Sequence, residues 1–213
     1  MPLRSSTSTS RSKPGRPPVY SEEERSQLLL RAAEEAFTTI GYGAATMEEI
    51  ARLAGMSKKT LYALFPDKES LFEGVVGSLG DCPWENPEAP PLLPPAEELR
   101  RRLLAMVTFI LSPRQIRLTR LLIAEAERTP KLAHDFHQRV ISKGRQFLKE
   151  AIRQAADAGI GPKVEDYEQW SSTVLGAALA RHHLSALFGK AHRAPKAQVE
   201  AQVDTALRAF GYL

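Results

Sequence analysis

The chain has little of what several classes of protein require. Only one of its 213 residues is a cysteine, Cys82, so it has no internal disulfide and no thiol partners for a zinc site. It contains no run of eighteen apolar residues, and no apolar stretch follows its basic N-terminus. We therefore expect neither a membrane span nor a secretory signal, and we predict a cytoplasmic protein with no membrane partner.

Motifs of catalysis and cofactor binding are absent as well. The sequence has no Gly-rich phosphate loop, no Gly-x-Ser-x-Gly and no CxxC pair. His134 and His137 have a spacing that metals can use, but no third ligand is evident nearby, so a solvated helix face is the simpler interpretation. We therefore predict no enzyme, no cofactor and no metal site.

The sequence does contain helical periodicity from residue 21 onward. Apolar residues recur at intervals of three and four, and capping residues, prolines or glycines mark the boundaries. No β-alternation and no fixed-period repeat occurs, so an all-α fold is expected. The predicted helices cover residues 21–40, 46–54, 58–65, 67–78, 96–111, 113–126, 130–159, 164–188 and 195–210.

The segment 46–72 is the most informative part of the chain. Thr46 and Glu49 predict a capping box that opens one helix. Gly55 falls where the chain must turn sharply, and Ser57 can cap the next helix. Two short helices joined by such a turn form a helix-turn-helix, whose second helix enters the major groove of DNA.

This part of the chain resembles the DNA-binding domain of the TetR family of bacterial one-component repressors. The matching residues are Ile40-Gly41-Tyr42, Thr46, Ile50-Ala51, Ala54-Gly55-Met56-Ser57, Thr60-Leu61-Tyr62, Phe65-Pro66 and Lys68-Glu69-Ser70-Leu71-Phe72. The segment 120–133 further resembles the C-terminal domains of the AefR-like branch. The resemblance implies a nine-helix fold with the DNA-binding helices at the N-terminus, acting on the bacterial nucleoid.

Four regions follow from these patterns. Residues 1–20 form a basic arm, rich in Ser, Thr, Arg and Pro, that should be disordered when free. Residues 21–78 form the helix-turn-helix domain. Six prolines lie in the segment 81–95, so residues 79–95 are predicted to be a stiff connection rather than a helix. Residues 96–213 are predicted to bind a ligand and to dimerise.

The predicted DNA contacts lie on the second helix of the motif and beside it. Lys58 and Lys59 are assigned to base edges or the groove. The other residues, assigned to phosphates or backbone positioning, are Thr46, Ser57, Thr60, Tyr62 and Lys68. Leu64 is left out because it cannot donate to a phosphate.

The arm is the second predicted DNA contact. Residues 1–21 carry four cations and no acid, whereas residues 22–75 have six Lys or Arg against ten Asp or Glu. The run from Lys13 to Pro18 resembles half of an AT-hook, which would place Arg16 in an A·T minor groove. A solvated charged tail is the alternative interpretation.

The resemblance also implies an apolar pocket for an unidentified small effector in the C-terminal helices. Candidate lining residues are Met106, Phe109, Ile110, Leu122 and Trp170, although such residues also form ordinary cores. Small residues at 171–180 and the apolar stripe of the last helix predict a two-fold helical seam. Its candidate residues are Ala178, Val199, Val203 and Phe210; a buried core within one subunit is the alternative.

These observations together predict a ligand-responsive repressor that binds a palindromic DNA operator as a homodimer. One alternative is a ligand-independent architectural DNA-binding protein on the same fold. An enzyme with an appended DNA-binding domain is the other, and it lacks a convergent nucleophile, base or metal set.

Overall fold

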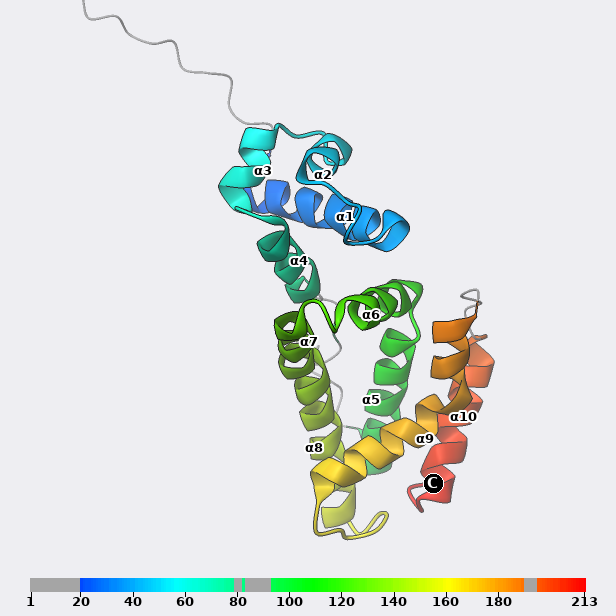
Figure 1. The fold of residues 1–213 in the computed structure, drawn as a ribbon. Helices are drawn as coiled ribbons and strands as arrows, with labels where there is room; N and C mark the ends of the chain where they lie inside the picture. Colours follow the sequence, from blue (N-terminus) through cyan, green and yellow to red (C-terminus); the bar gives the residue numbers. More distant parts are fainter. Residues whose placement is uncertain (1–19, 79–81, 83–92, 190–194) are drawn as a thin grey trace, which may run out of the picture.

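The computed structural model describes residues 20–78, 82, 93–189 and 195–213, and these form an entirely helical structure (Figure 1). No strand occurs among them, so the predicted all-α class is confirmed. The elements are α1 (Glu22–Ile40), α2 (Met47–Leu53), α3 (Lys58–Leu64), α4 (Lys68–Gly77), α5 (Pro95–Ile110), α6 (Pro113–Glu125), α7 (Pro130–Phe136), the π-helix η1 (His137–Ser142), α8 (Lys143–Asp157), α9 (Tyr167–Phe188) and α10 (Lys196–Ala209).

The described part contains ten α-helices where the sequence predicts nine helices. The difference lies in the single helix predicted over residues 130–159, which the structure divides into α7, η1 and α8. A π-turn closes its hydrogen bonds over one more residue than an α-turn, so it interrupts the α-helix without any proline or glycine. Apolar periodicity continues through the interruption and therefore gives no sign of it.

Side-chain caps fix where the N-terminal helices begin. Ser21 Oγ accepts from the amide of Glu24 at 3.1 Å, and the Glu24 carboxylate accepts from the amide of Ser21 at 2.7 Å. This is the reciprocal capping box that the sequence predicts for α1. Thr46 caps α2 by accepting from the amide of Glu49 at 3.2 Å, but the Glu49 carboxylate lies 4.0 Å from Arg52 and makes no return bond within the described residues. Only half of the second predicted box is therefore present there.

The turn between α2 and α3 is built as the sequence indicates. Gly55 has a φ of 65°, a left-handed conformation that costs glycine little. Ser57 Oγ then accepts from the amide of Thr60 at 3.1 Å and opens α3. Leu61 is fully buried, so it anchors α3 against the core of this domain.

Three aromatic rings join α1, the loop after it and α4. The ring centroids of Phe37 and Phe72 are 5.3 Å apart, and Tyr42 lies 5.2 Å from Phe37 and 4.8 Å from Phe72. These tilted and edge-on arrangements are the ones aromatic pairs prefer. Cys82 is buried in the same core, only 3% exposed.

The larger C-terminal part packs α5, α8, α9 and α10 around a second core (Figure 1). Helix α6 lies at the end of this bundle that faces the N-terminal helices. Three of its leucines, Leu118, Leu121 and Leu122, belong to the core of the N-terminal helices rather than to the second core. Helix α6 thus packs into the N-terminal core while also contacting α5 and α9 of the larger part.

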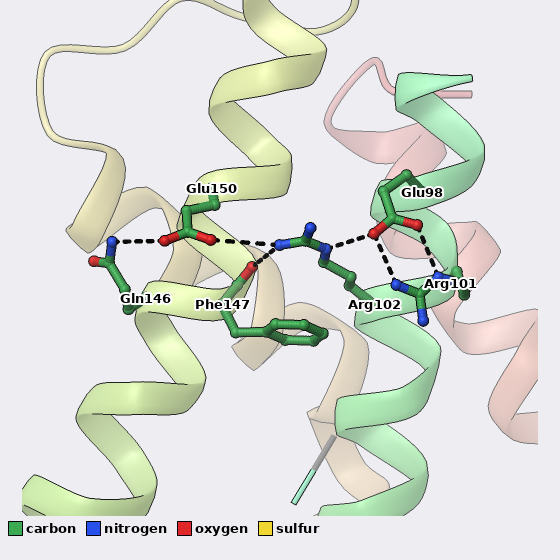
Figure 2. Close-up of polar contacts among 6 residues, drawn as sticks. All are labelled: Glu98, Arg101, Arg102, Gln146, Phe147 and Glu150. Atoms are coloured by element: carbon green, nitrogen blue, oxygen red, sulfur yellow. Dashed lines mark hydrogen bonds and ion pairs between the residues drawn. The ribbon is translucent and has the colours of Figure 1, made fainter. Parts of the chain in front are cut away.

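A polar network ties α5 to α8 (Figure 2). The Glu98 carboxylate accepts from both Arg101 and Arg102 at 2.7 Å. Arg102 also donates to the carbonyl of Phe147 at 2.9 Å and lies 3.7 Å from Glu150. Because Arg102 bonds to groups on both helices, it sets their relative position.

Candidate DNA-binding surface and ligand cavity

The exposed face of α3 consists of four residues: Lys58, Lys59, Tyr62 and Ala63. Tyr62 is 44% exposed, which leaves its ring and hydroxyl open to a partner. Leu64, by contrast, packs partly buried against the core, in line with its omission from the predicted contacts. The face that α3 offers to a groove is therefore two cations, an aromatic ring and a methyl group.

The two lysines have different neighbours. Lys58 Nζ lies 3.1 Å from a carboxylate oxygen of Glu48 on α2, and both side chains are at least half exposed. The hydrogen bond from Lys58 holds the pKa of Glu48 below its ordinary value. Among the described residues, Lys59 makes no ion pair or side-chain hydrogen bond. An anion that binds Lys58 would therefore have to displace Glu48, whereas no described acid competes for Lys59.

The hydroxyl side chains of the predicted site form hydrogen bonds at the N-terminal ends of α2 and α3. Ser57 and Thr60 lie with their hydroxyl oxygens 2.9 Å apart, and Thr46 caps α2. Caps of this kind leave the remaining amides of the first helical turn pointing outward, where an anion can accept from them. Their contribution to phosphate binding stays a prediction.

Lys68 is placed differently from its predicted role. Its ammonium donates to the carbonyls of Tyr42, Gly43 and Ala45 at 2.8, 3.3 and 3.1 Å and lies 4.6 Å from the centre of the Tyr42 ring. An ammonium has three donors, and all three are used here. We therefore reassign Lys68 from phosphate contact to holding the loop between α1 and α2. Arg16 lies outside the described residues.

A cavity of about 290 Å³ lies between α5, α6, α7, η1, α8 and α9. Its wall is mostly apolar and includes Met106, Phe109, Ile110, Phe136, Val140 and Leu175. Three of the five predicted ligand residues, Met106, Phe109 and Ile110, therefore line one cavity. Larger hollows of about 890 and 740 Å³ are surface grooves bordered by several charged side chains.

The other two predicted ligand residues lie elsewhere. Leu122 is buried in the core around α1 and α4. Trp170 donates from Nε1 to the hydroxyl of Tyr212 at 2.9 Å and packs edge-on against Phe210, with ring centroids 5.1 Å apart. Both residues therefore contribute to packing in this structure and do not line the cavity. The prediction was wrong because the sequence does not show which of the two cores an apolar residue joins.

Sequence reasoning missed the polar lining of the cavity. Gln115 and Thr119 on α6 and His183 on α9 line it together with Arg145 on α8. His183 Nε2 is buried without a hydrogen-bond partner in the described part of the chain. Burial lowers the pKa of His183 below its ordinary value and so favours the neutral ring. The only sequence signal was the adjacent pair His182 and His183 near the end of α9.

Three of the four predicted dimer residues lie inside the subunit, and the fourth, Phe210, is partly buried. Ala178 and Val203 are fully buried, Val199 is 6% exposed, and Phe210 is half-buried against Trp170. Side chains covered by their own chain cannot form a seam with a second copy. For Ala178, Val199 and Val203 this matches the alternative of a core within one subunit, so a two-fold seam has to use other residues.

Two ion pairs cross from the DNA-binding helices to the C-terminal helices. Arg114 on α6 grips Glu34 on α1, with Nε 3.0 and 2.9 Å from the two carboxylate oxygens and a terminal nitrogen at 2.8 Å. Lys131 on α7 lies 2.8 Å from Glu73 on α4. The Glu34 side chain is only 14% exposed, so the first pair is partly shielded from solvent.

The described residues contain neither a candidate metal site nor a candidate membrane-spanning helix. They contain no group of three or more His, Cys, Asp or Glu that could hold a metal ion. His134 and His137 are both exposed. No helix of the described part is long and apolar enough to cross a membrane.

Comparison with curated proteins gives three informative similarities, all of them partial. The chain is 39% identical over 88 residues to an uncharacterised HTH-type regulator, YhgD, of Bacillus subtilis. It is 49% identical over 55 residues to the HTH-type transcriptional activator FasR of Mycolicibacterium smegmatis and 36% identical over 63 residues to the regulator RutR of Escherichia coli. These matches span 40%, 26% and 30% of this chain, and only 46%, 25% and 29% of those proteins.

Solved structures match over most of the chain. A protein assigned to the TetR family from Mesorhizobium loti superposes with a TM-score of 0.76 at 27% identity, covering 90% of this chain and 96% of that one. A TetR-family regulator from Pseudomonas syringae pv. tomato superposes with a TM-score of 0.67 at 22% identity, covering 86% and 93%. The second likeness concerns the fold alone.

Two family models match and together cover both parts of the chain. The model of bacterial regulatory proteins of the tetR family matches residues 29–75, and that of the AefR-like transcriptional repressor C-terminal domain matches residues 97–212. The second match alone takes in more than half of the sequence. The chain therefore belongs to the TetR family, as a non-enzymatic helix-turn-helix transcriptional regulator with an AefR-like C-terminal domain.

Proposed function

We propose that this protein is a ligand-responsive repressor that binds a palindromic operator as a homodimer and leaves it when a small molecule enters the cavity. The observation that carries the proposal is the position of α6. This helix lines the cavity with one face and packs into the DNA-binding core with another. A change in the cavity wall can therefore reach the DNA-binding helices through α6, and Phe109, Phe136 and Val140 also line the cavity while contacting the same core.

The two faces of α6 have distinct residues. Gln115 and Thr119, four residues apart, line the cavity. Leu118 and Leu121 are buried in the core of the DNA-binding part. Arg114, in the first turn of α6, grips Glu34 on α1. Residues three and four apart share a helix face, which is why one helix can serve both sides.

The physical basis of the response is linkage. A ligand that prefers one position of α6 shifts the protein toward that conformation. If DNA prefers another, the ligand must weaken DNA binding by the same factor by which DNA weakens ligand binding. The ion pairs Glu34–Arg114 and Glu73–Lys131 are the polar contacts that would carry such a shift to α1 and α4.

Dimerisation is supported by apolar surface on the last two helices. Leu184 and Phe188, four residues apart on α9, are 59% and 89% exposed. Ala197 and Ala201 are exposed on the neighbouring α10. Large exposed apolar side chains beside small ones are typical of an interface between helices. We assign the two-fold seam to this surface, in place of the buried residues that the sequence suggested.

The sign of regulation has separate support. The C-terminal family model, which covers the cavity and the last helices, describes AefR-like transcriptional repressors. The similar FasR is named an activator, but its match covers 55 residues. A repressor blocks transcription by occupying its operator, so release by a ligand induces the neighbouring genes.

Genome-wide mapping of bound sites, followed by transcript measurement after deletion of the gene, tests the proposal. A few palindromic sites are expected, with transcripts of adjacent genes rising in the deletion strain. Many dispersed sites without transcript changes would contradict repression and favour the architectural alternative. Falling transcripts at the bound sites would indicate an activator.

A further inference from the structure

Three neutral polar groups meet at the cavity: the amide of Gln115, the hydroxyl of Thr119 and the imidazole of His183. None of these side chains makes a hydrogen bond to another residue in the described part of the chain. Polar side chains in an apolar wall ordinarily find a partner, because burying them unpaired costs free energy. The buried, unpaired Nε2 of His183, with two further polar groups beside it on one cavity, indicates that the partner is a bound molecule.

His183 gives the most specific indication. Its Nε2 is fully buried with no partner among the described residues, and burial favours the neutral ring. A neutral imidazole nitrogen either donates or accepts one hydrogen bond. The amide of Gln115 and the hydroxyl of Thr119 can also do either, so the three suit a group that donates and accepts at once.

The three groups are held at fixed positions relative to one another. Arg120, next to Thr119 on α6, donates to the carbonyl of Leu187 at 2.9 Å and also to those of Ala186 and Gly189. These carbonyls lie at the end of α9, one turn beyond His183. The arginine thus fastens the polar parts of α6 and α9 together, which is the preorganisation a binding site needs.

Charge narrows the class of ligand. No described aspartate or glutamate lines the cavity, so a cationic ligand would lose its hydration without a counter-ion. One cation, Arg145, lines it from α8, a different helix from those that carry the three neutral groups. The three neutral polar groups outnumber this one arginine, which favours an uncharged ligand over an anion.

We propose that the cavity binds a compact uncharged molecule with an apolar body and one hydroxyl group, which Gln115, Thr119 and His183 hydrogen-bond. The volume of about 290 Å³ corresponds to the space of roughly ten water molecules, and so to about ten non-hydrogen atoms. A hydroxyl both donates and accepts, as the three groups require. The inference rests on the proposed function, since it names the chemical class of the effector.

Calorimetry on the full-length protein with four matched probes tests the class. The probes are para-propylphenol, propylbenzene, para-propylbenzoate and para-propylphenyltrimethylammonium, which share one apolar body. We expect para-propylphenol to bind on the order of tenfold more tightly than propylbenzene, the factor that one hydrogen bond to a buried group supplies. It should also exceed both charged probes.

Two variants identify the recognition groups. Thr119→Val keeps the shape of the side chain and His183→Leu removes the ring nitrogen, so each should reduce the preference for the phenol over propylbenzene. His182→Leu is the matched control, because the adjacent histidine does not line the cavity, and it should keep the preference. Thermal melting identifies any variant that fails to fold, and Thr119→Val then stands alone as the test.

Equal affinity for the phenol and propylbenzene would overturn the proposal, as would the absence of binding by all four probes. Tightest binding of para-propylbenzoate would overturn it in favour of recognition by Arg145. Operator affinity is measured separately with and without para-propylphenol. Preferential phenol binding that leaves operator affinity unchanged would uphold the ligand class and contradict the ligand response in the proposed function.

Discussion

The two lysines at the start of α3 are equivalent in sequence but not in structure. Lys58 is paired with Glu48 on α2, whereas Lys59 has no acidic partner among the residues described. In the proposed complex, a DNA contact of Lys58 would break its pair with Glu48 and leave Glu48 near the phosphates, which would partly offset the gain in binding free energy. Lys59 therefore keeps more of its attraction for DNA.

We expect Lys59→Ala to weaken operator binding by about 1–3 kcal/mol, the range for a groove contact, and Lys58→Ala to weaken it less. The double variant should lose the preference for operator over random DNA while remaining a folded dimer. Fluorescence anisotropy with labelled operator at fixed salt measures both. Glu48→Gln is the informative control, because it frees Lys58 and should tighten binding. An unchanged operator preference in the double variant would remove α3 from the assigned contacts.

Glu98 makes stability depend on pH. Hydrogen bonds from Arg101 and then Arg102 hold the pKa of this carboxyl below its ordinary value of 4.5, against the opposing effect of burial. A carboxyl with a lowered pKa in the folded state contributes stability above pH 4.5, and this contribution disappears as the pH falls through the folded-state value. The protein should therefore lose stability on acidification below about pH 4.5.

Glu98→Gln tests this pH dependence. The variant should lower the free energy of unfolding by about 1–3 kcal/mol at about pH 7, because Arg102 loses a charged acceptor. Arg102 keeps its bond to the Phe147 carbonyl, so the contact with α8 remains. The acid limb of the stability curve should also become shallower in the variant. Urea unfolding at a series of pH values measures both effects. Parallel curves for the two proteins would show that Glu98 is not the responsible carboxyl.

At the scale of elements, we expect the contact between α6 and α1 to matter more for the effect of a ligand on operator affinity than for DNA binding without ligand. Arg114→Gln removes the grip on Glu34 while leaving the leucines of α6 in their core, so DNA binding without ligand should change little. The effect of a cavity ligand on operator affinity should shrink toward none. Arg117→Gln is the matched control on the same helix, since Arg117 is exposed and makes no ion pair with a described residue.

Operator titrations with and without para-propylphenol compare the two α6 variants. An undiminished ligand effect in Arg114→Gln would show that the coupling passes through the apolar face of α6 or through α7. A reduced effect in Arg117→Gln as well would show that any change of charge on α6 suffices. Either result would contradict the role given to the Glu34–Arg114 pair.

How far the sequence predicts an element depends on where its signal lies. The start of α1, the turn at Gly55 and the cap at Ser57 are local, because the residues that form them are within four positions of one another. The positions of Leu122 and Trp170 depend on tertiary packing and not on neighbouring residues, since either of two cores can bury an apolar side chain equally well. The sequence predicts a phosphate contact for Lys68, but its partners lie more than twenty residues away.

The cavity illustrates the same limit within one element. Met106, Phe109 and Ile110 are predictable as one apolar face of α5. Gln115, Thr119 and His183 become a site only when α6 and α9 meet, and no spacing in the sequence encodes that meeting. The split of the predicted 130–159 helix likewise depends on a π-turn that places Val140 and Ile141 at the cavity wall.

At the scale of the whole molecule, charge is divided unevenly along the chain. Residues 1–18 contain four cations and no acid, whereas residues 22–75 are net acidic. Deleting residues 1–18 should weaken binding to all DNA and reduce the slope of log K against log salt by about 0.9 for each phosphate that the arm neutralises. Titrations at several salt concentrations measure the slope. An identical slope for the truncated protein would show that the arm does not touch DNA.

The two-fold seam is the remaining property of the whole molecule, and we propose that the exposed side chains of α9 form it. The double variant Leu184→Glu with Phe188→Glu should dissociate the dimer, because each carboxylate would enter an apolar seam beside its copy, at a cost of several kcal/mol. Helical content should be retained, since both residues lie outside the subunit core. Phe210→Ala is the contrasting variant: it removes the packing against Trp170 and should lower the melting temperature without dissociating the dimer. Sedimentation velocity at low micromolar concentration separates the two cases, and a double variant that stays dimeric would place the seam on a different surface from this face of α9.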